Sequence, residues 1–190
     1  MVKGFMRTAL AAVLVAPLTA VAQNDMADVE IRVEKVADNV AVLYGRGGNI
    51  GVSVGEDGVF MIDDQYAPLT DKIRAALDTL SDQPVRFVIN THWHGDHTGG
   101  NENLGKAGAV IVAHDNVRER MSTDQFMKAF DRTVPASPKA ALPVITFDDS
   151  VTFHLNGDTI DVKHVASGHT DGDSVVFWQE ANVVHLGDLF

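Results

Sequence analysis

The sequence of 190 residues contains no cysteine. It therefore has no disulfide framework, no redox-active thiol and no thiolate ligand for a metal. Basic residues are also few, because 15 Lys and Arg stand against 26 Asp and Glu, which gives a formal net charge of −11. Binding to a phosphate backbone needs a basic face, so this balance argues against a nucleic-acid partner. Much of the acidity is read as a solvated surface that keeps the chain soluble.

Long apolar runs are equally scarce. One run spans residues 9–18, follows Lys3 and Arg7, and precedes Ala20-Val21-Ala22, which has the small-x-small form of a cleavage site. The run is too short to cross a bilayer, so residues 1–22 are predicted to be a secretory signal peptide. The mature segment 23–190 would then be periplasmic or secreted, with no stable membrane anchor after cleavage. The alternative at this point is an uncleaved anchor.

Four potential metal ligands lie within six residues, in the segment His92-Trp93-His94-Gly95-Asp96-His97. Neutral imidazoles and a carboxylate suit Zn²⁺ or a similar first-row ion. An apolar, β-branched run at residues 85–90 precedes the segment, and a glycine-rich turn at residues 98–100 follows it. The ligands are therefore expected where a strand ends and a helix begins, with two of them facing one ion and two facing a second. The bland alternative, a polar loop that happens to hold histidines, is disfavoured by the dense spacing.

On these residues the chain resembles the metallo-β-lactamase superfamily, whose hallmark is His-x-His-x-Asp-His after a strand. Three more segments match in the expected order: residues 58–63, which end in Asp63; Gly168-His169-Thr170; and residues 186–190, which contain Asp188. The resemblance runs from about residue 29 to the last residue. It implies an α+β fold, the four-layer αββα sandwich.

The resemblance also implies a binuclear zinc centre. The first ion would be held by His92, His94 and His169, and the second by Asp96, His97 and a bridging Asp188. Asp63 would accept a hydrogen bond from a ligand histidine. Zinc lowers the pKa of a bound water to near 7, so that hydroxide is available to attack a carbonyl carbon at neutral pH.

Asp96 is also the candidate catalytic residue, which would orient the nucleophile or shuttle its proton. Since the chain lacks cysteine, it does not match the β-lactamase class that uses a cysteine in its second zinc site.

The remaining pattern predicts the order of the elements. Hairpins are expected over residues 29–44 and 49–63, a helix near Pro68 that packs through Ile73, Ala76, Leu77 and Leu80, and a helix over residues 115–132. A proline-containing connector follows at residues 134–143, and then strands at 144–147, 151–155, 158–166, 174–178 and 183–187. The family fold normally continues past its bridging Asp with helices, strands and a final histidine. Residues 23–190 are therefore interpreted as a metallo-β-lactamase-like domain without its C-terminal part.

Several polar residues receive plainer interpretations. The other histidines are expected to be packed or solvent-facing, and Asp171 and Asp173 to form a polar turn. Trp93 either packs against the metal loop or rims the pocket, and the glycine-rich residues 45–49 could line the cleft. The remaining histidines are His114, His154, His164 and His185.

Taken together, the sequence predicts an exported, zinc-dependent hydrolase that cleaves an ester, lactone or lactam bond in a small-molecule substrate. Two alternatives stay open: a metallo-β-lactamase that hydrolyses β-lactam antibiotics, and a catalytically silent metal-binding fragment. Fold alone does not choose among substrates. The oligomeric state is also open.

Overall fold

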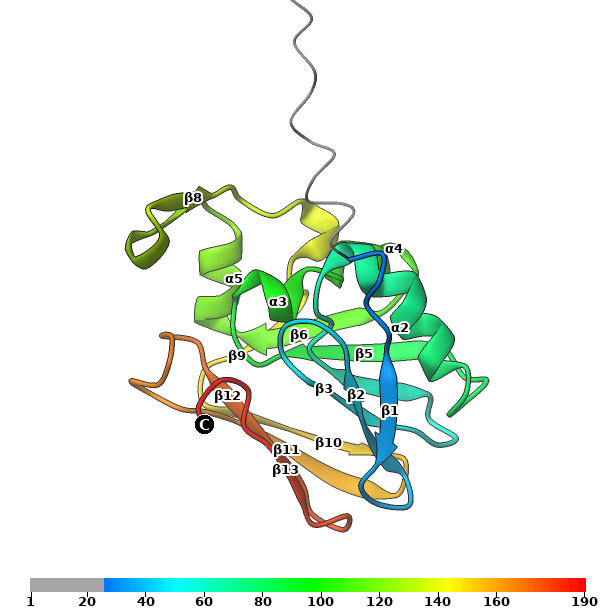
Figure 1. Cartoon of the computed structure of the whole chain (residues 1–190). Helices are drawn as coiled ribbons and strands as arrows, with labels where there is room; N and C mark the ends of the chain where they lie inside the picture. The colour runs from blue at the N-terminus through cyan, green and yellow to red at the C-terminus, as the bar shows by residue number, and fades with distance from the viewer. Residues whose placement is uncertain (1–25) are drawn as a thin grey trace, which may run out of the picture.

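The computed structural model describes residues 26–190, so the predicted signal peptide lies outside the described residues. Two β-sheets pack face to face, and helices cover the outer face of the first sheet (Figure 1). The first sheet has seven strands in the order β1-β2-β3-β4-β5-β6-β9. Its strands are β1 (Arg32–Lys35), β2 (Val40–Tyr44), β3 (Ile50–Ser53), β4 (Val59–Ile62), β5 (Val85–Asn90), β6 (Val110–His114) and β9 (Ile145–Phe147).

The first sheet changes from antiparallel to parallel at β4. Strands β1 to β4 are joined by the predicted hairpins and pair antiparallel, whereas β4, β5, β6 and β9 pair parallel. Parallel neighbours need crossover connections, and these contain the helices. The helices are α2 (Thr70–Leu77), which follows the 3₁₀ turn η1 (Ala67–Leu69), and α3 (Gly95–Thr98), α4 (Asn101–Lys106) and α5 (Asp115–Met121). As a result, the carboxyl ends of β4, β5 and β6 meet at one edge of the sheet.

Alternation along β4 divides the apolar side chains between two cores. Val59 and Met61 pack toward the helical layer together with Ile73 and Leu77 of α2. Phe60 and Ile62 face the second sheet, because successive side chains of a strand point to opposite faces. The near-continuous apolar sequence of this strand is therefore explained by burial on both faces.

The second sheet has the order β10-β11-β12-β13 and is antiparallel throughout. Ile160, Val176 and Trp178 face the core between the sheets, whereas Phe177 and Val184 are partly exposed on the opposite face. Within residues 26–190 no helix covers that face, so the described part of the sandwich has three of the four expected layers. Its strands are β10 (Ser150–Leu155), β11 (Asp158–His164), β12 (Ser174–Trp178) and β13 (Val183–His185).

The helix predicted over residues 115–132 is wrong beyond Met121. There α5 ends, and the chain forms a small hairpin from β7 (Gln125–Met127), the 3₁₀ turn η2 (Lys128–Phe130) and β8 (Arg132–Val134). Phe126 and Phe130 are 62% and 71% exposed, so no buried apolar stripe holds this stretch in a helix. The connector that follows contains one 3₁₀ turn, η3 (Lys139–Ala141).

Membrane-spanning helices are absent from residues 26–190, where no helix combines the length and the apolarity that crossing a bilayer requires.

Candidate metal centre

The sequence-predicted site residues come together at the carboxyl edge of the parallel strands. Asp63 directly follows β4, and His92 follows β5 after a single residue, Thr91. His94 is the N-cap of α3, so that Asp96 and His97 lie in the first turn of this short helix. The other two residues come from the second sheet: His169 from the loop between β11 and β12, and Asp188 from the segment after β13.

Four of these residues form a tight first group. His94 Nδ1 lies 3.2 Å from His92 Nε2 and 3.0 Å from His169 Nε2. Asp188 Oδ2 lies 3.7 Å from the Nε2 atoms of both His92 and His169. A tetrahedral zinc ion with bonds of about 2.0–2.2 Å separates its ligand atoms by roughly 3.3–3.6 Å. The donor types and their spacing therefore fit one such ion.

A second group surrounds His97. Its Nε2 lies 3.1 Å from Asp188 Oδ1 and 3.5 Å from Asp96 Oδ2. Within the described part of the chain this buried nitrogen makes no hydrogen bond. A buried, unsatisfied imidazole nitrogen is costly unless a ligand satisfies it, and two carboxylates beside it suit a cation. Because the two oxygens of Asp188 face different groups, the geometry suits the predicted bridging role.

Asp63 fixes the orientation of His97. The Asp63 carboxylate is fully buried, and its Oδ2 lies 2.7 Å from His97 Nδ1. It also accepts hydrogen bonds from the backbone N–H and the hydroxyl of Thr91, each at 2.8 Å. A proton on His97 Nδ1 leaves the Nε2 lone pair free to bind a metal. Thr91, which the sequence interpretation did not single out, is thus the residue that anchors Asp63.

The electrostatics of the cluster favour a positive charge at His97. Burial lowers the pKa of this imidazole, but Asp63, Asp188 and Asp96 outweigh burial and raise the pKa to about 9. His92 has the opposite environment. Burial and the neighbouring His97 imidazole lower its pKa to about 3, so it is a neutral donor at physiological pH. His92 is thus ready to bind a cation, whereas zinc would have to displace the Nε2 proton of His97, and the carboxylates beside His97 would favour that exchange by attracting the cation.

Two glycines let a loop approach the cluster closely. A Cβ atom at Gly48 would collide with the His97 ring, and one at Gly47 would lie 2.6 Å from Asp96 Cβ. Residues 45–49 were considered as a cleft-lining loop, but the structure places them behind His97 and outside the cavity lining. The small size of Gly47 and Gly48 therefore allows close packing against Asp96 and His97.

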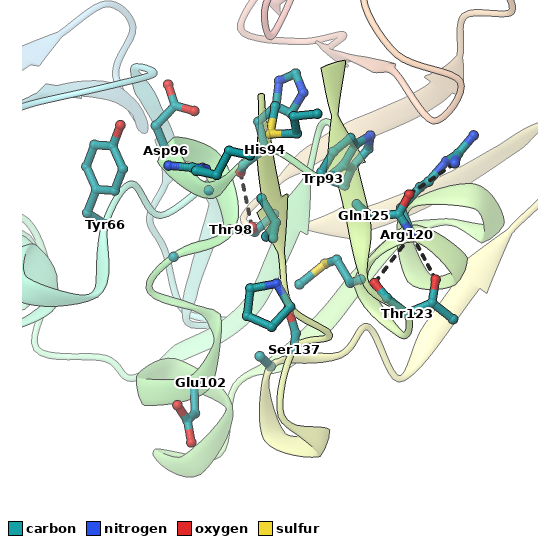
Figure 2. Close-up of a pocket in the computed structure, with 18 of the residues that line it drawn as sticks. Tyr66, Trp93, His94, Asp96, Thr98, Glu102, Arg120, Thr123, Gln125 and Ser137 are labelled. Atoms are coloured by element: carbon teal, nitrogen blue, oxygen red, sulfur yellow. Dashed lines mark hydrogen bonds between the residues drawn. The ribbon is translucent and has the colours of Figure 1, made fainter. Parts of the chain in front are cut away.

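A cavity of about 850 Å³ opens beside the centre, and Figure 2 shows His94, Asp96 and Trp93 along its wall. Of the two interpretations of Trp93, the rim of the pocket is the one that its position in the lining supports. His169 and Asp188 line the same cavity. The side chains nearest the metal positions can therefore meet a small molecule that enters from solvent.

The loop that carries His169 is held by the two aspartates expected to form a polar turn. Asp173 is buried and accepts a hydrogen bond from the Thr170 N–H, while Asp171 pairs with Arg120 at 2.7 Å. Of the remaining histidines, His114 and His164 stack at 3.8 Å between ring centroids, away from the candidate ligands. His185 hydrogen-bonds the Asn49 carbonyl and His154 is exposed on β10, so both match their plainer interpretations.

A two-sheet sandwich with a histidine- and aspartate-rich cluster at one edge is an arrangement suited to binding a divalent metal between the sheets. The chain belongs to the metallo-beta-lactamase superfamily, whose family model matches residues 43–190.

Two curated relatives are enzymes by name. The chain is 30% identical to the hydroxyacylglutathione hydrolase of Erythrobacter litoralis over 106 residues, which are 55% of this chain and 34% of that protein. It is 26% identical to the atrochrysone carboxyl ACP thioesterase of Aspergillus terreus over 167 residues, 87% of this chain and 46% of the relative. The chain thus spans less than half the length of the curated relatives it matches.

Solved structures share the fold. A metallo-beta-lactamase of Cronobacter sakazakii with a HARLDQ motif superposes with a TM-score of 0.67 and 20% identity, over 82% of this chain and 60% of that one. The subclass B3 metallo-beta-lactamase BJP-1 of Bradyrhizobium japonicum superposes with a TM-score of 0.65 and 21% sequence identity, over 78% of this chain and 57% of that one. At this identity the likeness establishes the architecture, and the αββα prediction is confirmed for the layers that the chain contains.

Proposed function

We propose that the chain is the metal-binding part of an exported, zinc-dependent hydrolase that cleaves a carboxylic ester, lactone or lactam bond. The observation that carries the proposal is the position of Asp188. One of its carboxylate oxygens faces the group around His94, and the other faces the group around His97. Such a centre suits two ions that share one carboxylate. When bound, a pair of divalent ions supplies Lewis acidity to a carbonyl oxygen and acidifies water at neutral pH.

The chain's own residues would divide the work. His92, His94 and His169 offer three imidazole donors, of which His94 and His169 line the cavity, and Asp96, His97 and Asp188 offer the second set. Asp96 lines the cavity with a partly exposed carboxylate, so it is placed to orient an attacking water and to hold its proton. Hydrolysis then adds the water oxygen to the carbonyl carbon, breaks the bond from that carbon to the leaving oxygen or nitrogen, and returns the water's proton to the leaving atom.

We include thioesters among the bonds that the chain could cleave, since one of the relatives is by name a thioesterase. A metallo-β-lactamase activity is the second candidate, and the shared fold with enzymes of that name favours it. Export is inferred from residues 1–22, which precede the described residues.

Elemental analysis of the purified full chain is the first test, with two zinc ions per chain expected. A panel of lactam, lactone, ester and thioester substrates follows, with and without a chelator. Asp96→Asn should keep the first ion and lower kcat by about a hundredfold or more. Full metal loading without hydrolysis of any substrate would favour the silent metal-binding module instead. Hydrolysis that survives complete removal of metal would refute the mechanism.

A further inference from the structure

The hairpin of β7 and β8 forms one wall of the cavity beside the metal centre. Met127, Phe130, Arg132 and Val134 all line that cavity together with His94 and His169. In Figure 1 the hairpin projects on the same side of the molecule as the loop between β11 and β12, which carries His169. A molecule bound at the metal centre would therefore lie against the hairpin.

The hairpin presents apolar side chains that the fold leaves uncovered. Phe130 is 71% exposed although it lines the cavity. For residues 126–128 and 130–133, the structure shows no hydrogen bond or ion pair to a described residue outside the hairpin. Apolar side chains that lie over a pocket without packing in the core can stabilise a bound ligand, because covering them removes apolar surface from water.

One positive charge in the cavity wall is also available to a ligand. Glu102 pairs with Lys106, and Arg120 pairs with Asp171. By contrast, Arg132 has no ion pair or hydrogen bond from its side chain within residues 26–190.

The charge of Arg132 also acts on Tyr66, another residue of the cavity lining. Burial and the Asp96 carboxylate raise the pKa of Tyr66, and the guanidinium groups of Arg46 and Arg132 partly offset this rise. Tyr66 lines the same cavity, beside Asp96 in Figure 2. A cavity-lining guanidinium without an ion pair or hydrogen bond among residues 26–190 is suited to a carboxylate or a phosphate.

We propose that this hairpin determines substrate specificity: Arg132 binds an anionic group of the substrate, and Phe130 covers an apolar segment next to it. This inference rests on the proposed function, which supplies the type of bond that is cleaved. It narrows the substrates to amphipathic anions in a chain whose net charge of −11 otherwise repels them.

A matched pair of esters tests this specificity in the zinc-loaded full chain. The pair is mono-4-nitrophenyl suberate, which ends in a carboxylate, and its methyl ester, which is neutral. Arg132→Ala should lower kcat/KM for the anionic ester about tenfold and change that for the methyl ester less than twofold. Arg74→Ala, at an exposed arginine of α2 outside the cavity, should change neither. A phosphate-ended analogue shows which anion is preferred.

The apolar part has its own matched control within the hairpin. Phe130→Ala should raise KM for both esters several-fold, because it removes a cavity-lining ring. Phe126→Ala removes a similarly exposed ring that does not line the cavity, and should leave KM unchanged. Equal effects of the two variants would overturn the role of Phe130.

A binding assay separates this proposal from the proposed function. Trp178 is buried, so a change in tryptophan emission on adding a ligand reports on cavity-lining Trp93. The full chain as purified should bind octanoate about tenfold more tightly than octanamide, and this preference should vanish in Arg132→Ala but persist in Arg74→Ala. That result supports the hairpin's role even if no ester is hydrolysed. Equal affinities, no octanoate binding, or a preference that survives in Arg132→Ala overturns it, even if the esters are cleaved.

Discussion

Replacing Asp63 by asparagine tests how the fold prepares His97 for a metal. The asparagine side chain would keep the size of the aspartate and one carbonyl oxygen, which can still accept from the Thr91 N–H. Its NH₂ group would replace the oxygen that now lies 2.7 Å from His97 Nδ1. Because the NH₂ group cannot accept a proton from Nδ1–H, the neutral form of His97 would carry its single proton on Nε2. That proton would then point at Asp96 and Asp188 and block the lone pair needed for the second ion.

The expected size of the effect follows from the burial of this network. Loss of an outer hydrogen-bond partner of a metal-ligating histidine typically costs 10–100-fold in metal affinity. The fully buried ion pair would also be broken on one side, which destabilises the metal-free fold by about 3 kcal/mol. Asp63→Asn should therefore lose the second zinc ion first and retain the first group, which Asp63 does not contact.

Asp64 supplies a matched control in the adjacent position. It is equally buried, and burial raises the pKa of its carboxyl well above its usual range, so it is held as a neutral acid. Its Oδ1 accepts a hydrogen bond from the Gly100 N–H, and the amide oxygen of an asparagine could accept the same hydrogen bond. Asp64→Asn should therefore cost about 1 kcal/mol or less and keep both ions.

The assay is zinc competition against a chelator of known affinity, combined with denaturant unfolding of the metal-free variants. Unchanged zinc affinity in Asp63→Asn, or an equal loss in Asp64→Asn, would refute the orientation argument.

Three further predictions follow from the same geometry. His92→Ala should reduce zinc from two ions to one per chain and abolish hydrolysis, as measured by elemental analysis and a substrate assay; full activity would contradict the assignment. Removing metal with a chelator should lower the melting temperature by about 10 °C from a state at a thousandfold excess of zinc over Kd; an unchanged melting curve would argue against a folded-state site. Gly48→Ala should displace the His97 ring and weaken the second ion, whereas Gly95→Ala, whose Cβ meets nothing within 4 Å, should bind zinc like the wild type.

The local parts of the fold and the site could be predicted from the sequence. The strand at residues 85–90 and the ligand-rich segment after it are adjacent in the chain, so their pattern contains the information needed to place them. His169 is 75 residues from His94, and no periodicity relates the two. Its place in the cluster was predicted only from the resemblance to a family. Thr91 was missed, and Gly48 was assigned to a cleft-lining loop, because their roles depend on what packs against them in three dimensions.

The hairpin of β7 and β8 shows where sequence reasoning fails for a physical reason. Charges and scattered apolar residues after Asp115 suggested that the helix continues, but a helix is maintained mainly by burial of one face. Val117 and Met121 are buried, whereas Phe126 and Phe130 are not. The stretch that departs from the prediction is the same one that lines the cavity, as expected where a sequence serves a ligand more than the core.

The metal centre also joins the two halves of the sandwich. The first sheet and its connections contribute His92, His94, Asp96 and His97, while the second sheet contributes His169 and Asp188. Neither half holds all the candidate ligands of either group, because both groups include Asp188. An ion that contacts both sheets binds only when they are packed together, so its binding free energy adds directly to the stability of that packing. Apolar burial between the sheets stabilises their packing but has no preferred direction, whereas metal ligands would fix the position of one sheet relative to the other. Metal occupancy and the shape of the cavity are thereby coupled, since His169 and the hairpin residues line the same space.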